Sequence, residues 1–201
     1  MTRWYSERKN EHFYKEAKRE GYRSRSAFKL KQIQKKYRIL KKGHIVIDLG
    51  AAPGGWSQVA KEIVGDEGVV LGIDLSPIKP IKGVTFLQGD MTKESSLQEL
   101  IESMEEKKAD AIISDMSPNI SGNYSVDHAR SIYLCEKAFI TASTFLKPGG
   151  NFLCKVFEGI ELPRFLQELK NSFGLVKNFT PPASRKSSSE IYIIAKSFKK
   201  Y

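Results

Sequence analysis

The chain has 201 residues, of which 40% are hydrophobic and 28% are charged, and its formal net charge is +10. This length and apolar content suit one domain with a substantial core and exclude wholesale disorder. No stretch approaches the roughly 18 consecutive apolar residues of a membrane span, and the charged N-terminus has no apolar signal segment, so we expect a soluble cytoplasmic protein.

The excess positive charge lies at the N-terminal end. Residues 1–42 contain 15 Lys and Arg against 4 Glu, a balance of +11, whereas residues 43–201 contain 18 against 19, a balance of −1. Aromatic residues are interleaved with these cations, at Trp4, Tyr5, Phe13, Tyr14, Tyr22, Phe28 and Tyr37. Cations neutralise phosphates and rings stack on bases, which predicts RNA or DNA binding. The alternative is a solvated helical face whose aromatic side chains pack inward.

Two helices are expected ahead of the sheet, over 6–20 and 26–38, with Ser24 or Ser26 able to cap the second. Further along, apolar and amphipathic segments alternate, which predicts a mainly parallel sheet with helices on both faces. We expect strands over 44–49, 68–74, 84–87, 110–114, 150–156, 173–179 and 190–196. The helices between them are expected over 56–63, 93–106, 127–146 and 160–172.

Turns and loops complete this plan. A turn over 147–150 should end the longest helix, and 181–189 is the clearest surface loop. We therefore divide the chain into a basic helical RNA-binding extension over 1–42, packed on the core, and a catalytic domain over 43–201. Cys135 and Cys154 lie in apolar runs and are expected to be unpaired buried thiols.

The segment from Asp48 to Ile63 carries the most specific motif. An apolar strand leads directly into Gly50-Ala-Ala-Pro-Gly54-Gly55, and a helix can begin at Trp56. Glycine lets the backbone bend tightly and approach a ligand closely. The segment has neither the Gly-x-Gly-x-x-Gly of dinucleotide sites nor the Gly-Lys-Ser/Thr of triphosphate loops. It therefore favours a neutral or cationic nucleoside ligand over a phosphate-rich one.

Acidic residues stand at or just beyond the ends of four predicted strands: Asp48, Asp74, Asp90 and Asp115. Ligands of open parallel sheets bind beyond these carboxyl ends. Asp74, 24 residues beyond Gly50, is placed to accept hydrogen bonds from ribose hydroxyls. Asp90 could accept from the exocyclic amine of adenine, and Asp115 could lie beside the reacting end of the ligand. Any one of them could be an ordinary turn or cap residue, but together they favour a nucleoside site.

These motifs resemble the FtsJ/RrmJ family of S-adenosylmethionine-dependent RNA ribose 2′-O-methyltransferases over nearly the whole chain. Asp48 to Trp56 is similar to the family's cofactor loop, Gln88-Gly-Asp90 to its adenine-side loop, and Ser114 to Asn119 to the loop after its fourth strand. The resemblance implies an α/β, Rossmann-like class I methyltransferase fold, with a seven-stranded, mostly parallel sheet whose last strand is antiparallel. It implies S-adenosyl-L-methionine as methyl donor, contacted by Gly54, Trp56, Asp74, Asp90 and Asp115 together with Gly50 of the turn.

By the same resemblance, the four active-site residues of the family fall on Lys29, Asp115, Lys155 and Glu190. Methyl transfer from a sulfonium to a ribose hydroxyl is an in-line displacement that requires alignment and a proton acceptor. We assign Lys155 as this general base, because Lys29 across the site and the sulfonium would both favour its neutral form. Asp115 would orient Lys155 and the methyl donor, and Glu190 would orient Lys29 or the ribose. No metal is expected.

Two segments depart from the family's pattern. The turn after Phe157 has the sequence Glu158-Gly-Ile-Glu161, where relatives often have Gln-Gly-Glu-Gly. The loop before Glu190 has Arg185 and Lys186 and then three serines, where relatives can be richer in arginine. The resemblance therefore leaves open which RNA contacts these two segments make.

The predicted reaction is 2′-O-methylation of a uridine ribose in large-subunit (23S) ribosomal RNA, either free or in the assembled 50S subunit. A transfer RNA is the nearest alternative substrate, because the same four residues would serve it. Messenger-RNA cap methylation is disfavoured because no additional cap-binding domain is recognisable. A non-catalytic RNA-binding ribosome assembly factor would not need all four charged residues, and an oxidoreductase would need the missing dinucleotide motif. No protein partner is implied, and a monomer is expected.

Overall fold

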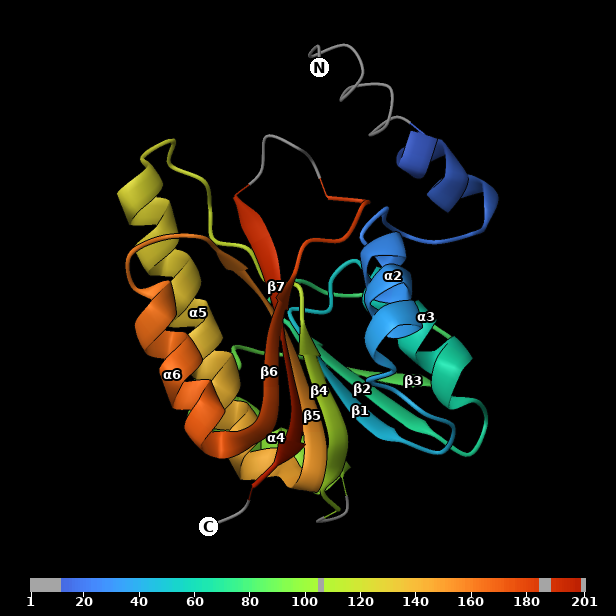
Figure 1. Ribbon diagram of the computed structural model, residues 1–201. Coiled ribbons are helices and arrows are strands. Elements are labelled where there is room, and N and C mark those ends of the chain that lie inside the picture. Colours follow the sequence, from blue (N-terminus) through green and yellow to red (C-terminus); the bar gives the residue numbers. More distant parts are fainter. Residues whose placement is uncertain (1–11, 105–106, 185–188, 200–201) are drawn as a thin grey trace.

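A single seven-stranded sheet forms the centre of the computed structural model, which describes residues 12–104, 107–184 and 189–199 (Figure 1). The strand order is β3-β2-β1-β4-β5-β7-β6, and β7 runs antiparallel to both of its neighbours. The strands are β1 Ile45–Leu49, β2 Val69–Asp74, β3 Val84–Gln88, β4 Ala109–Ser114, β5 Leu146–Phe157, β6 Phe173–Phe179 and β7 Glu190–Phe198. The predicted mostly parallel sheet with an antiparallel last strand is confirmed.

Helices cover both faces of this sheet, as predicted (Figure 1). Their bounds are α2 Ala27–Tyr37, α3 Gly55–Val64, α4 Glu94–Ser103, α5 Tyr124–Phe145 and α6 Leu162–Ser172. One apolar core lies between the sheet and α4, α5 and α6, and a second lies between the sheet and α2 and α3. The central strands β1 and β4 are apolar along almost their whole length because both of their faces are buried. None of the helices in the described part of the chain has the length and apolar character needed to cross a membrane.

The longest helix differs from its predicted bounds at both ends. It begins at Tyr124 rather than 127, because the Asn123 side chain caps it by accepting hydrogen bonds from the backbone N–H groups of Ser125 and Val126. It ends directly into β5, and the predicted turn over 147–150 is wrong. These residues belong to an irregular start of β5, where Ala109 and Ala111 of β4 pair with Leu146 and Asn151. The longer chain on the β5 side is accommodated as a bulge.

The described part of the N-terminal extension, residues 12–42, is here called the N-terminal segment and packs against α3. Residues 12–19 are helical, and the predicted residues 6–11 lie outside the described part. The Tyr22 hydroxyl donates to Glu62 of α3 at 2.6 Å. The backbone N–H of Arg23 donates to the Gln58 side chain, whose amide donates back to the Gly21 carbonyl. Residues 21–23, which connect the first described helix to α2, therefore dock on α3 through polar contacts as well as apolar ones.

Two predictions for this segment need correction. Tyr22 and Phe28 are buried in the core under α2, so the alternative of inward packing holds for them, and they cannot stack on bases. Tyr14 remains exposed, whereas Trp4 and Tyr5 lie outside the described residues. Ser26 occupies the N-cap position of α2 without making a side-chain cap bond, and its hydroxyl lies 2.7 Å from that of Ser24. Apolar burial, rather than a cap, therefore anchors α2.

Removing one buried side chain of α2 tests this anchoring. Leu30 is fully buried, so Leu30→Ala should lower the free energy of unfolding by about 2–5 kcal/mol. The exposed Lys35 on the same helix provides the control, and Lys35→Ala should change it by less than about 0.5 kcal/mol. Urea denaturation followed by circular dichroism measures both. Equal stability of Leu30→Ala and the wild type would mean that α2 is not part of the cooperative core.

Candidate active site

The glycine turn between β1 and α3 has the tight geometry that its sequence predicts. Gly50 adopts a φ of +73°, in the left-handed region that favours glycine. A Cβ atom added there would lie 2.2 Å from Cγ of Met116, so a larger residue would clash with that side chain. The backbone N–H groups of Gly50 and Ala51 both donate to the Ile73 carbonyl of β2. The turn is thereby held against the carboxyl end of the neighbouring strand.

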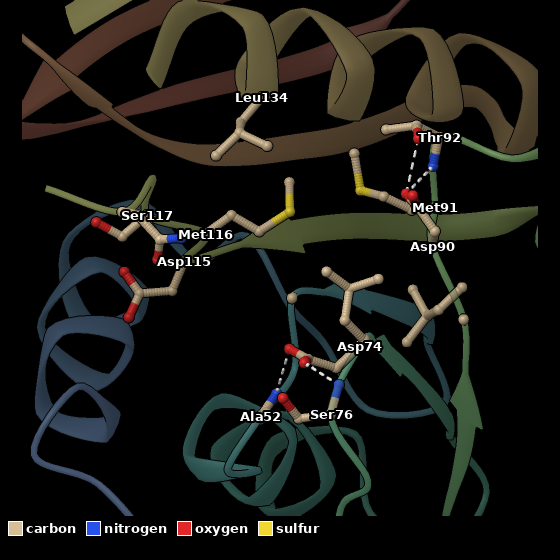
Figure 2. Close-up of a pocket in the computed structure, with 15 residues that line it drawn as sticks. Ala52, Asp74, Ser76, Asp90, Met91, Thr92, Asp115, Met116, Ser117 and Leu134 are labelled. Atoms are coloured by element: carbon tan, nitrogen blue, oxygen red, sulfur yellow. Dashed lines mark hydrogen bonds between the residues drawn. The ribbon is translucent and has the colours of Figure 1, made fainter. Parts of the chain in front are cut away.

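A cavity of about 470 Å³, here called the large pocket, opens beside this turn (Figure 2). It brings together four of the predicted cofactor-binding residues: Gly50, Asp74, Asp90 and Asp115. Figure 2 shows Met91, Met116 and Leu134 on the side of the cavity opposite Asp74. A pocket of this size, with apolar walls and a few fixed polar groups, is typical of small-molecule sites.

The two carboxylates at the ends of β2 and β3 are held by backbone groups. Asp74 accepts hydrogen bonds from the N–H groups of Ala52 at 3.0 Å and Ser76 at 2.8 Å, one on each oxygen. Asp90 accepts from the hydroxyl and the N–H of Thr92, and these bonds lower the pKa of Asp90. Each carboxylate oxygen has two lone pairs, so both residues retain acceptor capacity toward the pocket. The pocket therefore has two fixed, acceptor-only groups.

The four predicted catalytic residues form two ion pairs. Nζ of Lys155 lies 3.1 Å from Oδ1 of Asp115 and donates to the Asp115 backbone carbonyl at 2.6 Å. Nζ of Lys29 lies 2.5 Å from Oε1 of Glu190. Both lysines are buried, at 8% and 5% exposure, where an unpaired ammonium group would be costly. Burial opposes ionisation of Glu190, but the charge and hydrogen bond of Lys29 lower its pKa nevertheless.

Strand register explains why these side chains meet. Lys155 of β5 pairs directly with Tyr192 of β7, and Glu190 lies two residues along β7 on the same face. Lys29 reaches this face from α2, which covers it. Asp115 follows the end of β4, the other neighbour of β5. Three adjacent strands and one helix thus bring together residues that span most of the sequence.

Tyr192 is a polar member of this cluster that the sequence prediction missed. Its hydroxyl donates to Oδ1 of Asp115 at 2.7 Å. Burial raises the pKa of Tyr192 well above its usual range, and the charges of Asp115 and Glu190 add to this effect, so the hydroxyl keeps its proton. The alternation of side chains along a strand could have indicated Tyr192, since it lies two residues after Glu190.

Asp115 joins the predicted catalytic residues to the pocket. The two ion pairs and Tyr192 are called the catalytic cluster below. Asp115 lines the large pocket and also a smaller cavity of about 30 Å³, whose walls include Trp56 and Ser26. The Trp56 indole is buried and donates to the Ser26 carbonyl at 2.9 Å, so Trp56 lies between the turn and α2 rather than in the large pocket. Gly54 lines neither cavity, and a Cβ atom added there would approach Ile81 and Arg23.

Arg23 is a second residue that sequence analysis did not single out. Its guanidinium group donates to the backbone carbonyls of Pro53, Lys79 and Pro80. These contacts connect the N-terminal segment to the glycine turn and to the loop after β2. The arginine is recognisable in the sequence only as one more basic residue, because backbone carbonyl partners leave no sequence signal.

The sheet order, the glycine turn and the acidic pocket together define a Rossmann-like methyltransferase domain. The chain belongs to the FtsJ-like methyltransferase family, whose sequence model matches residues 22–198. The ribosomal RNA large subunit methyltransferase E of Methanothrix thermoacetophila is 52% identical over 186 residues, which cover 92% of this chain and 72% of that protein. The protein of the same name from Alkalilimnicola ehrlichii is 46% identical, with 98% and 94% covered.

A solved structure is similar over most of its length. The crystal structure from Plasmodium falciparum described as a ribosomal RNA methyltransferase superposes with a TM-score of 0.80 at 33% sequence identity. The match covers 88% of this chain and 98% of that one. The fold described above is therefore also found in a crystallised relative.

Asp48 is a buried carboxylate next to the site. It is the penultimate residue of β1 and accepts a hydrogen bond from the Ser57 hydroxyl at 2.6 Å. Its Oδ1 atom has no hydrogen-bond partner among the described residues. Burial, opposed by the Ser57 bond and reinforced by the charges of Asp115 and Asp74, raises the pKa of Asp48 to about 7. Ionised Asp48 therefore destabilises the folded state.

This predicts a pH-dependent effect of Asp48→Asn, which removes the charge but keeps an acceptor for Ser57. In the unfolded chain an aspartate ionises near a pKa of about 3.9. The folding penalty of ionised Asp48 thus develops between about pH 4 and pH 7 and persists above. Relative to the wild type, Asp48→Asn should gain stability as pH rises, by on the order of a few kcal/mol between pH 4 and pH 8. Urea denaturation at several pH values measures this, and a pH-independent difference would contradict it.

Proposed function

We propose that this protein transfers a methyl group from S-adenosyl-L-methionine to the ribose 2′-hydroxyl of a uridine in large-subunit ribosomal RNA. The observation that carries the proposal is the pair of buried Lys–carboxylate contacts that meets the large pocket at Asp115. The names of relatives at 46–52% identity support ribosomal RNA as the substrate. We place this activity in the cytoplasm.

The large pocket suits the adenosyl part of the methyl donor. Asp74 would accept from the ribose hydroxyls, Asp90 from the adenine amine, and the methionine side chains would pack on the base. Gly50 lines this pocket and has no Cβ atom, which allows a ligand to approach its backbone closely. When bound, S-adenosyl-L-methionine supplies an electrophilic methyl group on a cationic sulfur. Asp115, at the junction with the catalytic cluster, would face that positive charge.

Lys155 is positioned to accept the hydroxyl proton. A neutral lysine amine has two N–H groups and one lone pair. Its two N–H groups would be used by the Asp115 carboxylate and carbonyl, at 3.1 and 2.6 Å, leaving the lone pair for the acceptor hydroxyl. Tyr192, hydrogen-bonded to the same carboxylate oxygen, would fix the orientation of Asp115. This arrangement gives Asp115 two tasks, orienting the base and facing the methyl donor.

The role of Lys29 requires a revision. The sequence predicts that Lys29 favours neutral Lys155 as a nearby cation and that Glu190 orients Lys29 or the ribose, but the ion pair with Glu190 compensates the charge of Lys29. We infer that Lys29 instead donates to an oxygen of the acceptor nucleotide, with Glu190 holding it in place. The positive charge of the bound methyl donor is then the main influence that favours the neutral amine of Lys155.

The N-terminal segment would hold the RNA backbone. Lys18 and Arg19 in the first described helix, and Lys35 and Arg38 at the end of α2, are all exposed. Their charges are suited to phosphates and would make binding fall with rising salt concentration. Arg185 and Lys186, in the loop before Glu190, lie outside the described residues.

Methyl-labelled cofactor provides the test of substrate and product. The protein is incubated with separate pools of large ribosomal subunits, free ribosomal RNA and transfer RNA, and labelled nucleosides are then identified by mass spectrometry. We expect 2′-O-methyluridine in the large-subunit pool or its RNA. Label in transfer RNA would favour the alternative substrate, label on a base would contradict the proposed chemistry, and no label in any pool would favour a non-catalytic role.

Substitution of the proposed base should slow methyl transfer without changing the affinity for the methyl donor. Lys155→Ala should slow single-turnover methyl transfer by about 10²–10⁴-fold, the usual contribution of general acid–base catalysis. Its affinity for S-adenosyl-L-methionine, measured by calorimetry, should change little because Lys155 does not line the large pocket. Lys170→Ala, an exposed lysine on α6, serves as the control and should transfer at the wild-type rate. Near-normal transfer by Lys155→Ala would rule out the base assignment.

A further inference from the structure

An exposed tyrosine beside the catalytic cluster has no part in the function proposed so far. Tyr124 is the first residue of α5 and is 57% exposed. Its hydroxyl nevertheless donates to the Glu158 carbonyl at 2.5 Å, across the turn that follows β5. An exposed ring held at its far end is already ordered, so a flat ligand that stacks on it orders little more of the protein on binding.

The turn that holds Tyr124 is itself fixed next to the active site. The Glu158 N–H donates to the Ser189 carbonyl, immediately before catalytic Glu190. On its other side, the His128 ring bridges the Phe157 carbonyl and the Glu161 N–H. This turn begins three residues after Lys155. Three residues of extended chain span about 10 Å, so the Tyr124 hydroxyl, bound to Glu158, lies at the rim of the proposed acceptor site.

The chemistry of this rim favours a base over a phosphate. Ile160, two residues beyond the partner of Tyr124, is 90% exposed, and Ile120 in the loop before α5 is 64% exposed. Glu158 is exposed and negatively charged, which would repel a phosphate group, whereas the charge of Glu161 is compensated by Arg164 at 3.4 Å. The exposed cations of the N-terminal segment instead lie on α2 and the helix before it, on the opposite face of the sheet (Figure 1). The exposed cations of the N-terminal segment thus lie on one side of the site and the Glu158 carboxylate on the other.

We propose that Tyr124, together with Ile160, is a stacking platform for a nucleobase next to the methylated nucleotide. This inference rests on the proposed RNA substrate and adds to it a subsite that binds one base through its π face. The basic segment would hold phosphates on one side of the catalytic cluster, and Tyr124 would hold a base on the other. Stacking on an aromatic ring tolerates any base, so the platform would contribute affinity and orientation rather than sequence recognition.

Substitutions of Tyr124 separate stacking from other roles. Tyr124→Ala should raise the KM for large-subunit RNA by about 5- to 150-fold, the range for loss of one base–aromatic stack. The KM for S-adenosyl-L-methionine and kcat should stay within about two-fold, since Tyr124 does not line the large pocket. Tyr124→Phe keeps the ring but loses the hydrogen bond that orders it, so it should raise the KM for RNA by much less than Tyr124→Ala does. Tyr133→Ala is the matched control, because Tyr133 is another half-exposed tyrosine on α5, at 52%.

A binding measurement without turnover distinguishes this proposal from the reaction itself. Fluorescence anisotropy with a fluorescein-labelled nine-nucleotide uridine RNA should show weaker binding by Tyr124→Ala with an unchanged salt slope, because no phosphate contact is lost. A wild-type protein that binds this RNA but methylates neither large ribosomal subunits nor their free RNA would contradict the proposed function alone. Ile160→Ser, at a side chain too exposed to support the fold, should weaken binding in the same direction.

Three results would overturn the platform. One is unchanged RNA affinity and KM in both Tyr124→Ala and Ile160→Ser. Another is equal loss in Tyr124→Phe and Tyr124→Ala, which would assign the effect to the hydroxyl bond with Glu158. The third is a lower molecular mass of Tyr124→Ala or Ile160→Ser than of the wild type on analytical ultracentrifugation, with RNA binding intact. That result would make this rim a contact between copies of the chain.

Discussion

The rest of the site depends on the contacts that the Asp115 carboxylate makes with Tyr192 and Lys155. One oxygen of Asp115 accepts a hydrogen bond from the Tyr192 hydroxyl and lies within ion-pair distance of Lys155. The same residue lines the large pocket beside the glycine turn. The sheet makes this possible, because the order β4-β5-β7 places the residue that follows β4 beside the facing side chains of β5 and β7. A single carboxylate can therefore contact both the proposed base and the proposed methyl donor.

Burial constrains how the charges around Asp115 are arranged. Lys29 and Lys155 are almost inaccessible to solvent, and each has a carboxylate partner within 3.1 Å. Removing one partner of such a pair leaves a buried charge uncompensated, which is generally costly. Asp48, in contrast, is a buried carboxylate without a cationic partner among the described residues. Its described hydrogen-bond partner is Ser57, and it lies near two other carboxylates, Asp115 and Asp74. The glycine turn above Asp48 is thus built over a group that resists ionisation.

Local patterns in the sequence predicted the frame of this site well. Apolar runs marked the strands, the glycines marked the turn, and the acidic strand ends Asp74, Asp90 and Asp115 do share one pocket. Features that depend on contacts between distant elements could not be predicted in the same way. The inward packing of Tyr22 and Phe28 is set by α3 and the sheet. Lys29 and Glu190 are 161 positions apart, and only the family resemblance, not a local pattern, indicated that they lie in one site. The Asn123 cap was a local signal and could have been recognised.

The central claim, that Asp115 serves both the methyl donor and the base, is tested most directly by comparing Asp115→Asn with Asp74→Asn. Calorimetry gives the affinity of each variant for S-adenosyl-L-methionine, and rapid-quench experiments at saturating cofactor give the single-turnover rate. The account predicts that Asp74→Asn weakens binding but transfers at nearly the wild-type rate once saturated. Asp115→Asn should weaken binding and also slow transfer at saturation. A variant of Asp115 that changed only one of these two quantities would contradict the account.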